Sequence, residues 1–454
     1  MTSPSAPHDY RLPPAEGARR QLARAWLGLG IAALIVSGLL AILLVLSRTP
    51  GMQHVFPLRD FFRSALVVHV DLSVLIWFMA FAGVIWSLAG NARYPRLGRL
   101  GFWLAATGTA ILTVSPFFPD ARPLLNNYIP VLQQPAFFFG LGLAGLGFAL
   151  ALARALLTIR PSVDAGGTAV LQLGSLLAAV AGTLAFIAFA ISGSFAPPAE
   201  GQHYYEVVFW GGGHALQFQH ALLLVVAWFC LATALAHPPR IAPKAAAALF
   251  LLAALPLLAV PAIYVATEVG SGFHMAWFAR LMEAGHPLMT PLILLAGWSL
   301  WRVRGITAPA KSALAASFVL FAVGGILAFL IKGVNVVIPA HYHGSIVGVT
   351  LAFMGLTYVL LPQLGFAAVE GRMARWQPYV YGAGQLIHVL GLAWSGGYGV
   401  QRKVAGAEQV LTTLPQKIGM GMMGAGGLIA VIGGILFVVV CLRAMARRPL
   451  SAPR

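Results

Sequence analysis

Charged residues are scarce in this chain. They make up 9% of its 454 residues, whereas hydrophobic residues make up 59%, and the mean hydropathy is +0.84. A soluble domain carries roughly 25% charged residues, so most of this chain must face lipid or other apolar helices. The scarcity excludes an ordinary soluble domain and predicts an all-α integral membrane protein.

Acidic residues are the rarer of the two charge types. There are 12 Asp and Glu against 29 Lys and Arg, which leaves a net charge of +17. Such an excess could attract nucleic acid, but the basic residues lie in short segments between apolar runs, which is how membrane proteins orient themselves. We therefore expect no nucleic-acid partner and interpret the charge as a topology signal.

Cysteine is nearly absent as well. The chain has only Cys230 and Cys441, both inside apolar runs and far apart in sequence. This excludes a Cys-x-x-Cys metal site, a c-type heme attachment and a local disulfide framework.

Long apolar runs are what the chain does have. A helix needs about 20 apolar residues to cross a bilayer, and twelve stretches qualify: 25–47, 61–89, 98–116, 128–157, 168–195, 204–236, 245–268, 285–303, 311–332, 341–363, 376–399 and 418–442. They predict one membrane domain over 25–445, between a flexible arm over 1–24 and a basic tail over 446–454. Small residues from Gly419 to Gly427 predict close helix packing in the last span.

The basic residues orient these spans. With the N-terminus inside, 20 of the 29 Lys and Arg fall in inside segments and 9 in outside segments. By the positive-inside rule, this distribution predicts that both termini are cytoplasmic and that the protein lies in the inner (plasma) membrane of the cell.

Histidines occur inside the predicted spans, where ionisable or ligating side chains are rare and usually functional. They are His69, His214, His220, His341, His343 and His388. At about 1.5 Å per residue, His69, His214, His341 and His343 all lie in the outer third of the bilayer, whereas His220 and His388 favour structural roles. His274 and His286 flank the outer ends of neighbouring spans. Histidines at one depth indicate a metal or cofactor site between bundle helices.

The segment His341-Tyr342-His343 carries the most information. Residues two apart on a helix point about 200° apart, so one helix can present an imidazole to each of two cofactors. We expect His341 to serve one heme and His343 another. A low-spin heme needs a second axial ligand from another helix, and His69 lies at a suitable depth.

This pattern resembles subunit I of the heme-copper oxidase superfamily. The matching segments are "VVHVDLSVLIWFMAF" around His69, "FWGGGHALQF" around His214, and "AHYHGSIVGVTLAFMGLTYVLLPQLG" from Ala340 to Gly365. The resemblance covers the whole helical chain and implies a twelve-helix transmembrane bundle of that type. The tenth span is most similar to the C-family (cbb-type) oxidases and the related nitric oxide reductases.

The resemblance also implies roles for individual residues. His69 and His343 would be axial ligands of a low-spin heme, and His341 the proximal ligand of a high-spin heme. His214 would ligate a second metal, which is copper in oxidases and non-heme iron in nitric oxide reductases. Arg402 and Lys403 match the basic residues that the family places over the heme propionates, although simple interfacial anchoring would explain them equally well.

Two departures from the family concern the second metal and the active-site tyrosine. The family places two adjacent histidines on the seventh helix, whereas this chain has no His-His pair, and its nearest candidates are Phe273-His274 after the seventh span and His286 further on. Either His214 and His274 share a metal with a carboxylate such as Glu268 or Glu283, or the site holds no metal.

The tyrosine that mitochondrial-type oxidases carry four residues after the sixth-helix histidine is replaced by Phe218. Nitric oxide reductases have Glu at that position. Tyr264 on the seventh span could take the tyrosine's place, although an interfacial tyrosine is the simpler interpretation.

The leading hypothesis is a terminal oxidase-like subunit in which electrons pass from the low-spin to the high-spin heme and reduce O2. The chain has neither a copper-A cysteine pair nor a Cys-x-x-Cys-His motif. Its electron donor would therefore be a separate cytochrome c or cupredoxin subunit on the outer face. The alternatives are a nitric oxide reductase, a diheme electron-transfer or gas-sensing subunit without the second metal, and a twelve-helix transporter without heme.

Overall fold

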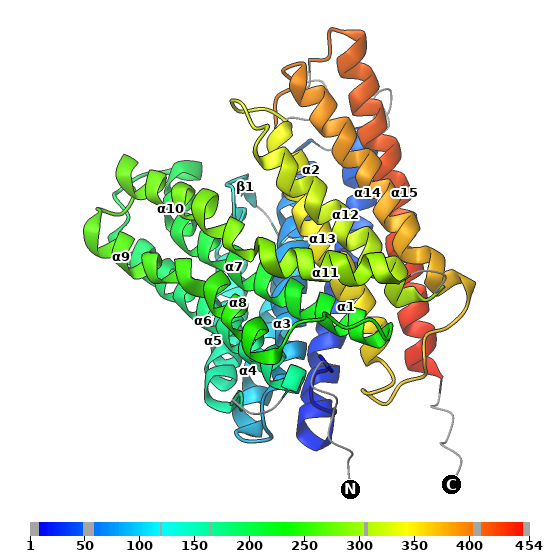
Figure 1. Ribbon diagram of the computed structural model, residues 1–454. Helices are drawn as coiled ribbons and strands as arrows, with labels where there is room; N and C mark the ends of the chain where they lie inside the picture. The colour runs from blue at the N-terminus through cyan, green and yellow to red at the C-terminus, as the bar shows by residue number, and fades with distance from the viewer. Residues whose placement is uncertain are drawn as a thin grey trace, which may run out of the picture. The chain divides into compact units, whose positions relative to one another are not determined.

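The computed structural model describes residues 9–48, 59–118, 120–162, 166–303, 307–402 and 410–447. Over these residues the chain is helical apart from one two-stranded ribbon and its connecting loops (Figure 1). The predicted all-α class is confirmed. Lys403 lies outside the described residues, as do residues 1–8 of the predicted arm and 448–454 of the predicted tail.

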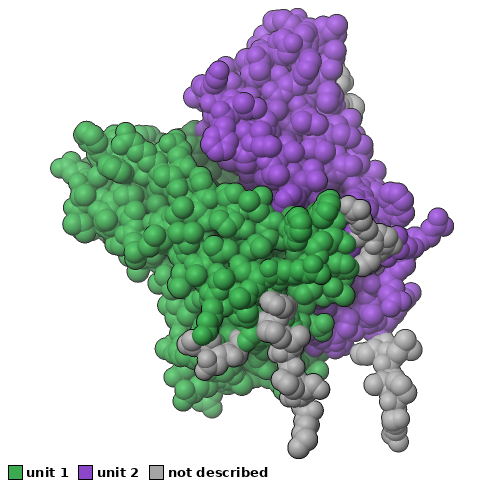
Figure 2. Space-filling view, viewed as in Figure 1, with its two compact units in different colours: residues 1–33, 70–302 green, residues 34–69, 303–454 purple. Residues whose placement is uncertain are grey.

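The helices form two compact units, which Figure 2 shows in different colours. Unit 1 comprises residues 1–33 and 70–302, and unit 2 comprises 34–69 and 303–454. The chain passes between the units within its first helix and again directly after His69.

Unit 1 contains most of the helices. They are the first half of α1 (Gly17–Arg48), η1 (Asp71–Ile76), α3 (Trp77–Ala89), α4 (Pro95–Val114), η2 (Ser115–Phe117), α5 (Pro135–Thr158), α6 (Gly166–Phe195), α7 (Gly201–Ala234), α8 (Pro243–Ala254), η3 (Leu255–Leu258), α9 (Ala259–Ala266), α10 (Gly272–Gly285), η4 (His286–Met289) and α11 (Thr290–Arg302). The ribbon pairs β1 (Arg122–Leu124) with β2 (Val131–Gln133) in antiparallel fashion, with Pro123 opposite Leu132.

Unit 2 is built from the second half of α1 and four further helices, together with nearly all of α2. These are α2 (Arg59–Val70), α12 (Pro309–Ala328), α13 (Val337–Leu360), α14 (Arg372–Gly397) and α15 (Leu414–Ala446).

Several of these elements join end to end into longer helices. The 3-10 segments η2, η3 and η4 contain Pro116, Pro256 and Pro287 respectively. A proline removes one backbone donor and disturbs the preceding turn, so the helix tightens locally. It continues after η3 and η4, whereas η2 ends α4 because Phe118 is extended. Joining α2–η1–α3, α8–η3–α9 and α10–η4–α11 gives the predicted twelve helices.

Ten of the twelve helices in the described part of the chain are long and apolar enough to cross a membrane. The other two are α10–η4–α11 and α14. The last of these carries Arg372, Arg375, Pro378 and His388, which make it less apolar. Three predicted starts were wrong by more than four residues: the spans expected to begin at residues 25, 128 and 285 begin at Gly17, Pro135 and Gly272. The helix at Pro135 begins there because proline favours the first position of a helix.

Glycines bring pairs of helices into close contact, as the small residues of α15 predict. A Cβ atom on Gly384 of α14 would lie 2.8 Å from the carbonyl oxygen of Gly426 on α15. In unit 1, a Cβ atom on Gly101 of α4 would lie 2.9 Å from the carbonyl oxygen of Gly147 on α5. Small residues allow such backbone contact between membrane helices, and the close packing expected for Gly419–Gly427 is confirmed.

The expectation of a flexible arm over 1–24 does not hold for residues 9–24. Helix α1 already begins at Gly17, and the Tyr10 and Leu12 side chains before it are buried. The Tyr10 hydroxyl donates to the carbonyl oxygen of Ile241 at 3.0 Å, and its ring packs edge-on against Phe229. Burial raises the pKa of Tyr10 to about 12. The segment is ordered because it buries these apolar side chains, which its proline-rich composition did not indicate.

Candidate functional site

Four histidines of unit 2 share one hydrogen-bond arrangement, in which Nδ1 faces a backbone carbonyl oxygen. The pairs are His69 with Ser37 (2.9 Å), His341 with Gly324 (2.7 Å), His343 with Pro339 (2.8 Å) and His388 with Met423 (2.9 Å). A carbonyl oxygen can only accept, so Nδ1 must carry the proton. The lone pair then lies on Nε2, which is the arrangement that metal-ligating histidines use.

The rings of His341 and His343 turn toward different neighbours of α13. His341 donates to Gly324 of α12, whereas the His343 ring lies 5.0 Å from the ring of His388 on α14. This divergence is expected of two residues separated by one position on a helix.

The crossing of α12 and α13 explains the short His341 bond. A Cβ atom on Gly344 would lie only 2.6 Å from the Cα atom of Gly324. Because neither glycine has a side chain, the helices approach closely enough for the His341 ring to reach the Gly324 carbonyl.

His69 lies in α2 directly before an irregular segment. Residues Asp71–Ile76 form a π-helix, a rare geometry that is frequent at functional sites. The Asp71 side chain is 1% exposed, and neither carboxylate oxygen has a hydrogen-bond partner among the described residues. A carboxylate in such surroundings is costly to keep charged.

In unit 1, His214 and Tyr128 form the centre of an aromatic cluster. His214 of α7 is 4% exposed, and its Nδ1 lies 2.7 Å from the Trp210 carbonyl oxygen. The Tyr128 hydroxyl lies 3.0 Å from each ring nitrogen of His214, and it accepts a hydrogen bond from Gln217 at 3.3 Å. Asn126 holds this loop, because its side-chain oxygen accepts the backbone N–H of Tyr128 at 3.1 Å.

His274 belongs to the same cluster. It is fully buried on α10, and its Nδ1 lies 3.1 Å from the Thr267 hydroxyl. Its ring packs 5.1 Å from Phe278, which also packs 5.7 Å from His214. The two predicted second-metal histidines therefore share one aromatic neighbour.

Tyr264 packs its ring 5.0 Å from His274, but its hydroxyl is engaged elsewhere. That hydroxyl donates to the Ala188 carbonyl oxygen at 3.1 Å and lies 2.7 Å from the Ser192 hydroxyl. Both partners belong to α6, so the hydroxyl is fixed toward that helix.

Comparisons with known proteins identify the family of the chain. The family model described as "Cytochrome C and Quinol oxidase polypeptide I" matches residues 21–436. The chain belongs to this family, which contains subunit I of the heme-copper oxidases. The resemblance drawn from the histidine motifs is therefore confirmed at the level of the family.

Two relatives of this oxidase-family chain are uncharacterised proteins, and one solved structure shares its fold. An uncharacterised protein of Rickettsia prowazekii (strain Madrid E) is 29% identical over 510 residues, which cover 93% of this chain and 96% of that protein. An uncharacterised protein of Aquifex aeolicus (strain VF5) is 27% identical over 368 residues, which cover 78% and 88%. The cryo-EM structure of a heme-copper terminal oxidase dimer matches 97% of this chain and 86% of that chain, with a TM-score of 0.72 and 15% identity.

The unit 2 histidines fit what this oxidase family would require of heme ligands. His69 and His343 each keep Nε2 as the nitrogen with the lone pair, and so does His341. Imidazole ligands held by a carbonyl oxygen have a fixed tautomer and orientation. Arg402 lies in the loop after α14 and is half-buried.

The donor set in unit 1 does not fit a three-ligand metal site. Among the described residues, no group of three or more His, Cys, Asp or Glu side chains is placed to hold a metal ion. Glu268 and Glu283, the carboxylates expected to assist His214 and His274, are both exposed. His286 instead packs its ring 4.5 Å from Phe218.

Tyr128 is the site residue that the sequence did not reveal. It precedes the helix to which it was assigned, and only the ribbon β1–β2 returns it to His214 on α7. The Asn126-Asn127 pair before it was an available turn signal, but a turn alone does not identify the partner of the residue that follows.

Proposed function

We propose that this chain is a terminal oxidase-like subunit that binds two hemes and reduces O2. His69 and His343 would hold a low-spin heme, and His341 would hold a high-spin heme. The observation that supports this best is the shared arrangement of the unit 2 histidines, each with Nδ1 on a backbone carbonyl oxygen. When bound, the hemes would supply one-electron chemistry and a site for a gas.

The protein's own contribution is the orientation of these imidazoles. The Ser37 and Pro339 carbonyl oxygens hold the rings of His69 and His343, so these rings would not have to reorient on ligation. The Gly324 carbonyl does the same for His341 and makes that imidazole a more basic ligand.

The Tyr128–His214 pair would take part in proton transfer and would not bind a metal. The hydroxyl of Tyr128 is within hydrogen-bond distance of His214 and Gln217, so it holds a proton beside the imidazole in an aromatic cluster.

A second candidate follows from the donor count in unit 1. Two histidines without a third ligand favour a diheme electron-transfer or gas-sensing subunit that holds neither copper nor non-heme iron. In the nitric oxide reductase alternative, non-heme iron would be present and NO would replace O2 as the substrate.

The remaining assignments extend the proposal to the cell. The protein would lie in the inner membrane with both termini cytoplasmic, following its Lys and Arg distribution. A cytochrome c or cupredoxin subunit on the outer face would donate electrons, and Arg402 and Lys403 would lie near the heme propionates.

The deciding experiment is metal analysis and reduced-minus-oxidised spectroscopy of the purified complex, before and after carbon monoxide. Two hemes per chain, one of which binds carbon monoxide, would support the gas-reducing proposal. Stoichiometric copper would favour O2, and iron beyond the two hemes would favour NO. Two hemes without a second metal would favour the second candidate, and a chain without heme would refute both.

Variants assign the ligands. His69→Ala or His343→Ala should remove the low-spin heme spectrum, whereas His341→Ala should remove carbon monoxide binding and leave the low-spin spectrum. His388→Ala is the matched control, because His388 has the same Nδ1 contact but is not assigned to iron. Loss of the low-spin spectrum in that control would contradict the assignment of His343.

A further inference from the structure

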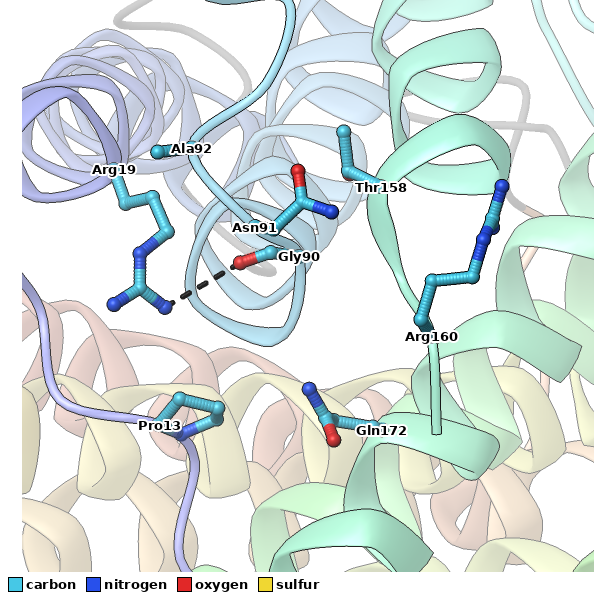
Figure 3. A pocket seen from close by; sticks show the side chains of 8 residues that line it. All are labelled: Pro13, Arg19, Gly90, Asn91, Ala92, Thr158, Arg160 and Gln172. Carbon is cyan, nitrogen blue, oxygen red and sulfur yellow. Dashed lines mark hydrogen bonds between the residues drawn. The ribbon is translucent and has the colours of Figure 1, made fainter. Parts of the chain in front are cut away.

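Unit 1 contains a recess of about 370 Å³, which Figure 3 shows from close by. Its walls come from the segment before α1, the first turn of α1, the α3–α4 loop, the end of α5 and the start of α6. The side chains that matter are Arg19 and Arg160 on opposite sides, with Asn91, Thr158 and Gln172 between them and Ala92 at the rim. The volume is within the range of small-ligand sites.

Backbone carbonyls hold the guanidinium of Arg19 in place. It donates to the carbonyl oxygens of Pro14 (2.9 Å), Leu88 (3.3 Å) and Gly90 (3.4 Å). Figure 3 shows the bond to Gly90 and the position of Arg19 across the recess from Arg160. Arg19 therefore presents a fixed positive charge to the recess.

Arg160 uses only part of its guanidinium group in hydrogen bonds to described residues. Its Nη1 donates to the carbonyl oxygens of Leu156 (2.7 Å) and Ile159 (2.9 Å). Its Nε and Nη2 have no hydrogen bond to any residue that the structure describes. Planar guanidinium donors of this kind match the oxygens of a phosphate group.

A third guanidinium lies behind the wall of the recess. Arg154 is 3% exposed and donates to the Asn91 carbonyl oxygen at 2.9 Å, while its Nε has no partner among the described residues. Arg154 and Arg19 donate to the carbonyl oxygens of the adjacent residues Asn91 and Gly90, so two positive charges lie close together. Among the residues that the structure describes, no acidic side chain lines the recess, and none of these three arginines forms an ion pair with a carboxylate.

Like charges held together without a counter-charge are unfavourable. A bound anion would therefore reduce the repulsion between these guanidinium groups and stabilise the folded protein. The recess lies where five helical segments end or begin, which is where membrane helices meet the surface. The exposed Arg93, Arg96 and Arg99 follow directly on the α3–α4 loop and the start of α4. Basic pockets between transmembrane helices at such a surface bind anionic headgroups.

We propose that this recess, defined by Arg19 and Arg160, binds a phosphate-bearing anion, and that its natural occupant is the phosphodiester headgroup of an anionic lipid. The proposal does not depend on heme binding or on the reaction at the histidines. A soluble phosphate compound shares the same chemistry, and the experiment distinguishes the two sources.

The test uses the purified full-length protein in detergent. Native mass spectrometry would count bound lipid during titration with phosphatidylglycerol, with phosphatidylcholine as the zwitterionic comparison. In parallel, inorganic phosphate would be tested for its effect on the thermal unfolding temperature. The wild type should bind phosphatidylglycerol in preference to phosphatidylcholine.

Two variants address the recess without disturbing its walls. Ala92→Glu places a negative charge at the exposed rim, with Ala92→Gln as the uncharged control of similar size. Arg160→Gln removes an exposed charge, with Arg240→Gln of the α7–α8 loop, which does not line the recess, as the control for net charge. Ala92→Glu and Arg160→Gln should each weaken phosphatidylglycerol binding about fivefold, the factor that corresponds to one surface charge, and the two controls should leave it unchanged.

The outcomes separate clearly. If inorganic phosphate stabilises the wild type but not Ala92→Glu, and lipid type has no effect, the recess takes a soluble phosphate compound and the lipid assignment is overturned. If Ala92→Glu and Arg160→Gln bind phosphatidylglycerol as the wild type does and phosphate has no effect on unfolding, the whole proposal is refuted.

Discussion

Replacing Gly344 by alanine should loosen the crossing of α12 and α13 and release the His341 ring. The new Cβ atom would lie 2.6 Å from the Cα atom and 2.8 Å from the backbone nitrogen of Gly324. Both are backbone atoms, so no side chain can rotate away. Ordinary contact begins at 3.4 Å, so the helices would have to separate by about 0.8 Å at this point.

The same displacement reaches the candidate heme ligand. The bond from His341 Nδ1 to the Gly324 carbonyl oxygen is now 2.7 Å, and a shift of that size along it would lengthen it to about 3.5 Å, the limit of a hydrogen bond. Overpacking costs roughly 1–3 kcal/mol, and loss of the hydrogen bond costs about 1 kcal/mol more. We therefore expect a lower thermal unfolding temperature and weaker carbon monoxide binding by the reduced protein.

The matched control is Gly325→Ala, one residue beyond the contact on α12. No atom lies within 4 Å of its added Cβ, so this change should leave stability unchanged or raise it by up to about 1 kcal/mol, because alanine favours helix. Thermal unfolding of both purified variants, each with its carbon monoxide difference spectrum, compares them directly. Equal unfolding temperatures would refute the packing argument, and an unchanged carbon monoxide spectrum in Gly344→Ala would refute the link to His341.

Three further predictions concern other contacts. Tyr128→Phe removes the hydroxyl beside His214, so we expect a loss of roughly 1–3 kcal/mol in unfolding free energy; an unchanged denaturation midpoint would show that the contact contributes nothing. Gly426→Ala puts a Cβ atom 2.6 Å from the Gly384 carbonyl oxygen and should lower the unfolding temperature, whereas Gly421→Ala, with no atom within 4 Å, should not. Burial raises the pKa of Tyr10 to about 12 from 10.0, so its contribution to stability is complete below pH 10 and is lost as the pH rises to 12. The stability difference between wild type and Tyr10→Phe should shrink over that interval, and a constant difference would contradict the assignment.

The number of helices could be predicted from the sequence because the thickness of a bilayer fixes the length of an apolar run. The breaks inside helices could not be placed as reliably. Pro256 and Pro287 sit within continuous helical rods that tighten into 3-10 turns and go on, whereas Pro135 begins a helix. A proline has the same effect on local backbone in each case, and only its surroundings decide whether the helix resumes.

The prediction of a flexible N-terminal arm was wrong for a different reason. Its composition indicates a flexible arm, but Tyr10 and Leu12 are buried, and Tyr10 contacts Phe229 and Ile241. These partners are more than 200 residues away in sequence. Composition describes the segment alone, and it cannot reveal an apolar surface that the rest of the chain supplies.

The candidate site also combines local features, which could be predicted from the sequence, with long-range contacts, which could not. The opposite directions of His341 and His343 follow from helical periodicity, which is a local property. The Ser37 carbonyl under His69 and the Gly324 carbonyl under His341 depend on where neighbouring helices cross. A backbone carbonyl leaves no signature in the sequence, so the ligands could be predicted but not the atoms that orient them.

The absence of a histidine next to His274 is best understood from the exposure of Phe273. The nearest counterpart in this chain to the family's adjacent histidines is Phe273-His274, at the start of α10 in the eighth helix, where Phe273 is 77% exposed whereas His274 is fully buried. Neighbouring residues on a helix point about 100° apart, so a histidine at position 273 would lie on the exposed side while His274 stays against Tyr264 and Phe278. The departure from the family pattern is therefore more than one substituted side chain. It includes the direction in which the start of α10 faces, and restoring the histidine alone would not restore a third ligand beside His214.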